Sequence, residues 1–166
     1  GPMKYSILFL SLLSILSVPL SAQTLSFEEM DQVLGENWKG TLTYLDYQSE
    51  KKVDIPVELA VRKLKEGQYV LAYSYPEEPK ANSTSKMKLS KDGRKVGKYT
   101  ILSRESLDDG RIKIVCIGKG KDDKKPATLF YTYILSEKEF VMRKDVEYSL
   151  GNQQPFFRNE FRFTRN

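Results

Sequence analysis

The chain contains 166 residues with 27 basic and 22 acidic side chains, a single cysteine and no histidine. The lack of histidine excludes a Ser-His-Asp triad, a Cys-His pair and zinc sites built on histidine. Because the charges look interspersed rather than gathered into a one-sided basic stripe, we expect no nucleic-acid partner. We also expect no metal and no cofactor.

The first residues have the features of a processing segment. Gly1-Pro2 is typical of a protease-cleavage scar, and residues 3–22 carry a basic start, an apolar stretch from 7 to 18 and a small residue at the end. This pattern indicates a secretory signal peptide, and the apolar stretch is shorter than the roughly 20 residues of a membrane span. We therefore expect a periplasmic or secreted protein whose single domain, residues 23–166, has no integral membrane span.

A short helix is predicted over residues 26–35. Ser26 and Glu29 form a capping-box pair, and Gly35 is suited to the C-terminal stop. The apolar stripe consists of Phe27, Met30, Val33 and Leu34.

The rest of the chain alternates between apolar and polar residues, with turn signals between the runs. The expected strands cover residues 38–46, 52–64, 68–75, 83–90, 96–105, 111–118, 127–135, 140–150 and 157–163. A meander of this length usually closes on itself, because closure removes exposed edges. The sequence therefore predicts an all-β, antiparallel up-and-down barrel of about 8–10 strands with one short N-terminal helix. A two-sheet sandwich is the alternative.

The residues at the two ends of this meander resemble those of lipocalins, in the calycin superfamily. In that group a Gly-x-Trp motif follows a helical turn, and an arginine from the last strand packs across the tryptophan. Here Gly35-Glu-Asn-Trp38 is one residue longer, and the resemblance implies that Arg158 or Arg162 supplies the arginine. The stack would contribute about 0.5–2 kcal/mol. Haem-binding barrels similar to nitrobindin use an axial histidine, which this sequence lacks.

Tyrosines are frequent on the faces that alternation assigns to the interior. Several buried hydroxyls in one space need partners, so they indicate either a ligand pocket or a solid core whose hydroxyls reach the rim. The candidate ligand-binding tyrosines are Tyr44, Tyr69, Tyr73, Tyr131, Tyr133 and Tyr148.

Two polar residues, Lys144 and Asn159, occupy positions where alternation predicts apolar side chains. An inward Lys144 would need an anion, because an unpaired buried ammonium is costly. A ligand carboxylate held by Lys144, Asn159 and a tyrosine hydroxyl would supply it. The alternative is a bulge that turns Lys144 outward beside Asp145.

The acidic pairs 77–78, 108–109 and 122–123 all fall in predicted turns, where carboxylates are usually solvated, so catalysis is not expected. We predict a monomeric exported barrel that carries a small, largely apolar or fatty-acid-like ligand. One alternative is a solid barrel whose loops 76–85 and 119–126 bind a protein or glycan. A cofactor-free enzyme on a calycin scaffold is another.

Overall fold

The structure is a computed structural model that describes residues 1, 23–151 and 153–166. The predicted signal peptide, residues 3–22, lies outside the described residues. Among the helices of the described part, none combines the length and the apolar character needed to cross a bilayer.

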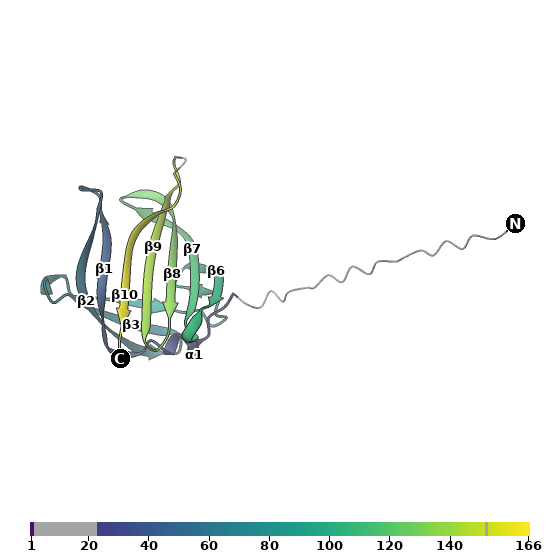
Figure 1. Ribbon diagram of the computed structural model, residues 1–166, viewed down its shortest axis with the longest axis horizontal. Helices are drawn as coiled ribbons and strands as arrows, with labels where there is room; N and C mark the ends of the chain where they lie inside the picture. Colours follow the sequence, from purple (N-terminus) through teal and green to yellow (C-terminus); the bar gives the residue numbers. More distant parts are fainter. Residues whose placement is uncertain (2–22, 152) are drawn as a thin grey trace.

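Within the described residues, ten antiparallel strands form one sheet that curls into a nearly closed barrel (Figure 1). The strands are β1 (Gly35–Asp46), β2 (Lys51–Lys65), β3 (Gln68–Ser74), β4 (Ser83–Lys88), β5 (Lys95–Val96), β6 (Tyr99–Ser106), β7 (Ile112–Asp122), β8 (Lys125–Leu135), β9 (Glu139–Tyr148) and β10 (Phe156–Thr164). Their order is β4-β3-β2-β1-β10-β9-β8-β7-β6-β5, so nearly every strand pairs with its neighbours in sequence. This confirms the predicted up-and-down barrel rather than the two-sheet sandwich.

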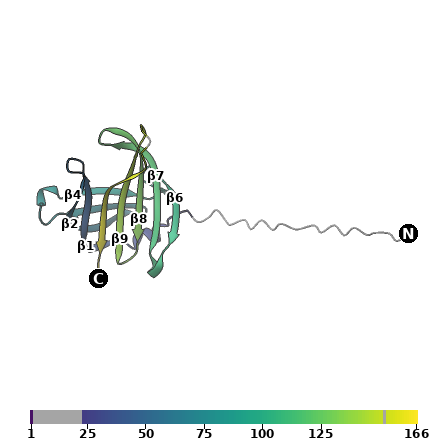
Figure 2. The ribbon, with the colours of Figure 1, turned by 45° about the horizontal axis from the view of Figure 1, so that its top comes forward.

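The two halves of the sheet cross each other at a steep angle. Figure 1 shows β8, β9 and β10 running vertically in front of β2 and β3, and Figure 2 shows the same crossing from a tilted view. The hairpins β1–β2, β7–β8 and β9–β10 lie at the upper end in Figure 1, whereas α1 and the C-terminus lie at the lower end. Short 3-10 helices cover Pro79–Ala81 and Asp108–Gly110.

The barrel wall is weakest between β4 and β5, which end the sheet. They are joined by the Leu89–Val96 bridge and by short hydrogen bonds, including Gly97 N to Lys88 O at 2.7 Å. The N-terminal segment ties down the neighbouring part of this seam, since Leu25 N donates to Gly93 O at 2.9 Å and Arg104 Nη1 donates to Thr24 O at 2.9 Å.

The helix α1 is shorter than predicted and spans Phe27–Asp31. Its capping box forms as expected: Glu29 N donates to Ser26 Oγ at 3.1 Å, and Ser26 N donates to Glu29 Oε1 at 3.3 Å. The helix ends early because Gly35 already pairs with Val61 as the first residue of β1.

The lower end of the barrel is closed around Trp38, whose side chain is fully buried. Its indole Nε1 donates to Val33 O at 2.9 Å. The guanidinium that covers the ring belongs to Arg165, 4.0 Å from the ring centroid, so the expectation that Arg158 or Arg162 fills this place is wrong. Arg162 instead contacts Glu139 and Glu160 on the outer face.

A β-bulge in β10 explains why Arg158 is elsewhere. Phe157 pairs with Asp145 and Asn159 pairs with Lys144, which leaves Arg158 as the extra residue. The bulge reverses the alternation before it, so Phe157 faces outward, with Arg143 5.1 Å from its ring centroid, and Arg158 turns inward. Phe157 and Asn159, which simple alternation would place on the same face, therefore lie on opposite faces.

The charged run at 119–125 is also different from the prediction. Strands β7 and β8 continue through most of it and are joined by a two-residue turn, in which Asp123 and Lys124 have φ values of 46° and 63°. Positive φ at both positions matches the twist of a tight hairpin. As a result Asp122 is a strand residue and is buried.

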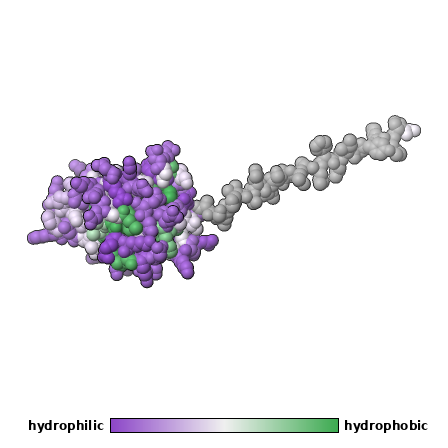
Figure 3. All heavy atoms as spheres, turned by 90° about the horizontal axis from the view of Figure 1, so that it is seen from below, coloured by the Kyte–Doolittle hydropathy of each residue, from purple (hydrophilic) through white to green (hydrophobic). Residues whose placement is uncertain are grey.

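The outer surface is mostly hydrophilic when viewed from below (Figure 3), apart from a few small apolar areas. Alternation accounts for this, because strand residues that do not face the core point to solvent.

Candidate ligand-binding site

The barrel encloses a cavity of about 330 Å³ that is partly open to solvent. This volume lies at the small end of the range of ligand pockets, about 300–1,000 Å³. The walls come from β3, β4, β6, β8, β9 and β10. The lining side chains used below are Leu71, Tyr73, Ser85, Met87, Tyr99, Tyr131, Tyr133, Met142, Lys144, Asn159 and Phe161.

The cavity opens around the free edge of β4. Four consecutive residues, Ser85 to Lys88, line it, although successive residues of a strand point to opposite faces. The hollow therefore passes around this edge, and Gly97 and Val96 border it on the other side of the seam. The gap that leaves β4 without a full partner strand is thus also the entrance.

Aromatic rings form much of the inner wall. Tyr99 and Tyr131 meet edge to face with their ring centroids 4.7 Å apart, and Tyr73 packs against Phe161 at 4.8 Å. Such pairs hold the rings in defined positions.

Tyr99 has room for its ring only because residue 118 is glycine. A Cβ built on Gly118 would lie 2.4 Å from Tyr99 Cδ1, far below a normal contact. Gly118 faces Tyr99 from β7, where it pairs with Leu129 of β8.

We expect Gly118→Ala to displace the Tyr99 ring and to lower the free energy of unfolding by about 1–3 kcal/mol, as overpacking does. Urea unfolding measures this. In a Tyr99→Ala background the same substitution should cost much less, because the obstructing ring is gone. An equal cost in both backgrounds would show that the steric contact is not the cause.

Five of the eight predicted ligand-binding residues line the cavity: Tyr73, Tyr131, Tyr133, Lys144 and Asn159. Lys144 and Asn159 thus face inward, and the bulge lies at Arg158 rather than at Lys144. Their role in binding stays a prediction.

The other three predicted residues lie outside the cavity lining. Tyr69 lies beneath α1, where its hydroxyl donates to Asp31 Oδ1 at 2.6 Å. Tyr148 donates to Asp122 Oδ2 at 2.8 Å near the upper end. Tyr44 pairs with Asn159 and Val53 in the sheet but does not border the hollow.

Tyr73 and Tyr133 keep their hydroxyl protons well above neutral pH. Burial raises the pKa of Tyr73 to about 12, and burial raises the pKa of Tyr133 further above its usual value. The Tyr73 hydroxyl lies 3.8 Å from the Met142 sulfur, a weak acceptor. Tyr133 lines the cavity, where its hydroxyl can bind a ligand or water.

A buried ionic cluster lies at the upper end, around Asp122. The Asp122 side chain is only 4% exposed, and Lys144 Nζ and Arg158 Nε each lie 3.4 Å from its Oδ1. Its Oδ2 accepts hydrogen bonds from Tyr47 at 2.5 Å and from Tyr148 at 2.8 Å. The anion that an inward Lys144 requires is therefore supplied by the chain itself.

These partners determine the protonation state of Asp122. Burial opposes ionisation, but the hydrogen bonds from Tyr47 and Tyr148 and the charge of Lys144 outweigh it, and they hold the Asp122 pKa below its ordinary value. Tyr47 is half-buried and donates to this carboxylate, so its own pKa is raised, by burial first and then by that hydrogen bond.

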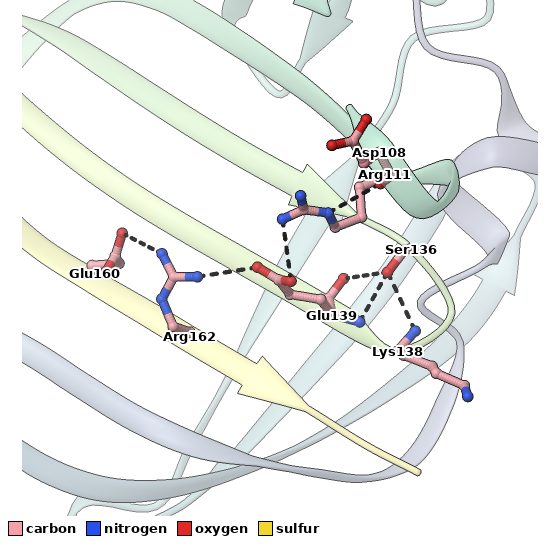
Figure 4. Close-up of polar contacts among 7 residues, drawn as sticks. All are labelled: Asp108, Arg111, Ser136, Lys138, Glu139, Glu160 and Arg162. Atoms are coloured by element: carbon pink, nitrogen blue, oxygen red, sulfur yellow. Dashed lines mark hydrogen bonds and ion pairs between the residues drawn. The ribbon is translucent and has the colours of Figure 1, made fainter. Parts of the chain in front are cut away.

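Hollows are also present on the outside of the barrel. One, of about 700 Å³, lies at the lower end between Arg111, the β8–β9 turn and Thr164. Figure 4 shows that one of its charged side chains, Glu139, is bound by both Arg111 and Arg162, and that Arg162 also reaches Glu160. Another, of about 240 Å³, lies over β1, β2 and β3.

No three His, Cys, Asp or Glu side chains gather into a possible metal site in the part of the chain that the structure describes. The inner wall of the cavity offers apolar contact, hydroxyl and amide groups, and the Lys144 ammonium, which is neutralised by Asp122.

Comparison with known proteins supports the architecture. No family model matches the sequence, and no curated protein matches it either. Among solved structures, the chain is similar to the crystal structure of Rv2717c from M. tuberculosis, with a TM-score of 0.56 over 84% of this chain and 96% of that chain. The two sequences are 12% identical, so the similarity shows the fold alone.

Proposed function

We propose that the protein is an exported, lipocalin-like barrel that binds or carries a small, largely apolar ligand. The cavity of about 330 Å³ is the observation that carries this proposal, because it favours carriage over a solid barrel that acts only through its loops. The signal-peptide pattern of residues 3–22 supports export. The Arg165–Trp38 stack supports the lipocalin-like assignment.

The ligand does not need to carry an acid group. Asp122 already lies beside Lys144, so a carboxylate is not required to neutralise the ammonium. The polar groups that line the cavity include the Tyr133 hydroxyl and the Asn159 amide. We therefore propose a neutral ligand, mainly apolar, with one or two hydrogen-bonding atoms.

The direct test is native mass spectrometry of residues 23–166, purified from the natural host and compared with the denatured mass. This segment contains every described strand and the whole described core. A reproducible excess mass that disappears on denaturation would establish a carried ligand. Equal masses, together with no shift in melting temperature across a panel of neutral and acidic lipids, would refute the proposal.

A substitution at the entrance links binding to the cavity. In the parent protein, a ligand at about 100 times its Kd should raise the melting temperature by about 5–10 °C. Ser85→Trp should fill the mouth of the cavity and abolish this rise. Thr84→Trp places the same ring on the opposite face of β4 and should leave binding intact. Equal binding by both variants would place the ligand elsewhere.

A further inference from the structure

The net charge of the chain is concentrated in residues 86–98, a segment that borders the entrance of the cavity. Residues 86–98 contain six basic side chains and one acidic side chain, which gives this segment a net charge of +5. The whole chain also carries +5, so the remaining residues sum to zero. The charges look interspersed along the sequence, but the excess of positive charge is confined to this segment. We name the six exposed side chains the basic face: Lys86, Lys88, Lys91, Arg94, Lys95 and Lys98.

The basic face has no internal neutralisation. Among the described residues, none of its six members lies within 4.0 Å of a carboxylate, whereas Lys63, Arg143 and Arg158 elsewhere each have such a partner. The nearby Asp92 carboxylate is occupied by the Ser90 hydroxyl at 2.7 Å and the Arg94 backbone N–H at 3.0 Å. Six unpaired cations on one hairpin and the adjoining turn attract an anionic partner.

The position of the basic face identifies the kind of partner. Lys86 and Lys88 belong to the stretch of β4 around which the apolar cavity opens, and Gly97, beside Lys98, borders the other side. The partner should therefore match two features, the unpaired cations and the apolar cavity that opens beside them. A lipid surface does so, because its anionic head groups would contact the lysines while its apolar interior lies opposite the cavity mouth. We propose that the basic face docks this barrel on an anionic lipid surface.

The docking should be purely electrostatic. The large apolar side chains of the segment are Leu89 and Val96, which are buried, and Met87, which is half-buried and lines the cavity, so none is fully exposed to insert into lipid. Binding should therefore be reversible and should weaken steeply with salt, since the Debye length falls from about 10 Å at 0.1 M to about 3 Å at 1 M.

The test is co-sedimentation of residues 23–166 with lipid vesicles. This segment omits the apolar stretch 7–18, which would bind lipid by itself. We expect binding to vesicles of phosphatidylcholine with one-third phosphatidylglycerol at about 0.1 M salt, and loss of binding at about 1 M salt or with phosphatidylcholine alone. The triple variant Lys86→Glu/Lys88→Glu/Lys95→Glu should bind at least about tenfold more weakly.

The matched control is Lys39→Glu/Lys51→Glu/Lys138→Glu, which changes three exposed lysines outside the basic face by the same total charge. It should bind much more tightly than the basic-face variant. Equal weakening of both variants would show that only net charge matters, and it would overturn the proposal. No vesicle binding by the parent protein would overturn it too, as would tighter binding to DNA than to vesicles. Ligand carriage is measured separately by native mass spectrometry. The proposal of lipid docking and the proposal of ligand carriage can therefore fail independently.

Discussion

Replacement of Asp122 by asparagine is expected to lower the free energy of unfolding by about 2–4 kcal/mol at pH 7. The substitution keeps the shape of the side chain but removes the negative charge that Lys144 and Arg158 share. Two cations would then remain together at the upper end without a carboxylate. Tyr47 and Tyr148 would also lose the charged acceptor of their hydrogen bonds.

The effect should depend on pH in a definite direction. The Asp122 pKa is depressed in the folded protein, so its contribution is complete above the pKa of the unfolded chain, about 4, and is lost as the pH falls through the folded value. The difference in stability between the parent protein and Asp122→Asn should therefore shrink below about pH 4.

Asp123→Asn is the matched control, because Asp123 is exposed and asparagine tolerates its positive φ. It should change stability by no more than about 0.5 kcal/mol. Urea unfolding at several pH values measures all three proteins. If Asp122→Asn and Asp123→Asn behaved alike, Asp122 would not be the centre of a stabilising cluster.

Replacement of Arg165 by methionine is expected to cost about 2–4 kcal/mol and to loosen the lower end of the barrel. The guanidinium covers Trp38, and each of its nitrogens donates to a different backbone carbonyl: Glu137 O at 2.6 Å, Leu34 O at 2.7 Å and Gln32 O at 2.8 Å. It thus links the last residues of the chain to the β8–β9 turn and to the turn after α1.

The single tryptophan makes this change directly visible, since Trp38 is the only source of indole fluorescence. Arg165→Met should shift the emission to longer wavelength as water reaches the ring. Arg165→Lys should recover only part of the stability, because an ammonium cannot reproduce the fork of donors.

Arg162→Met is the control, since that side chain is 52% exposed and its ion pairs lie on the surface. Its cost should stay below about 1 kcal/mol, with no change in emission. A comparable loss at Arg162 would mean that surface ion pairs, not the cover over Trp38, hold this end together.

Local signals predicted most of the barrel. Alternation in β2, β8 and β9 and turn residues such as Gly93 indicate strands and hairpins without knowledge of what lies across the sheet. The capping box likewise marks the start of α1, although the end of the helix depends on where β1 begins to pair.

The site was predicted less completely, because its main features depend on distant contacts. Asp122 lies in a charged run typical of a solvated loop, and its burial requires partners 75 residues before it and 22 residues after it. The bulge at Arg158 has no mark in the sequence, yet it reverses the faces of its neighbours. Tyr99 was not predicted as a cavity residue, because Gly97 interrupts the expected strand 96–105 and apolar and polar residues alternate only weakly there.

The pairing of β1 with β10 also has a consequence for how the chain folds. Lys39 of β1 pairs with Thr164 of β10, which lies 125 positions later in the chain, so this pairing forms only after β10 has been synthesised. Contacts of such long separation slow folding because the intervening loop must close before they form. During synthesis β1 can pair with β2, but its other edge stays unpaired until β10 emerges. The strand that carries Trp38 is therefore the one exposed longest to pairing with another molecule.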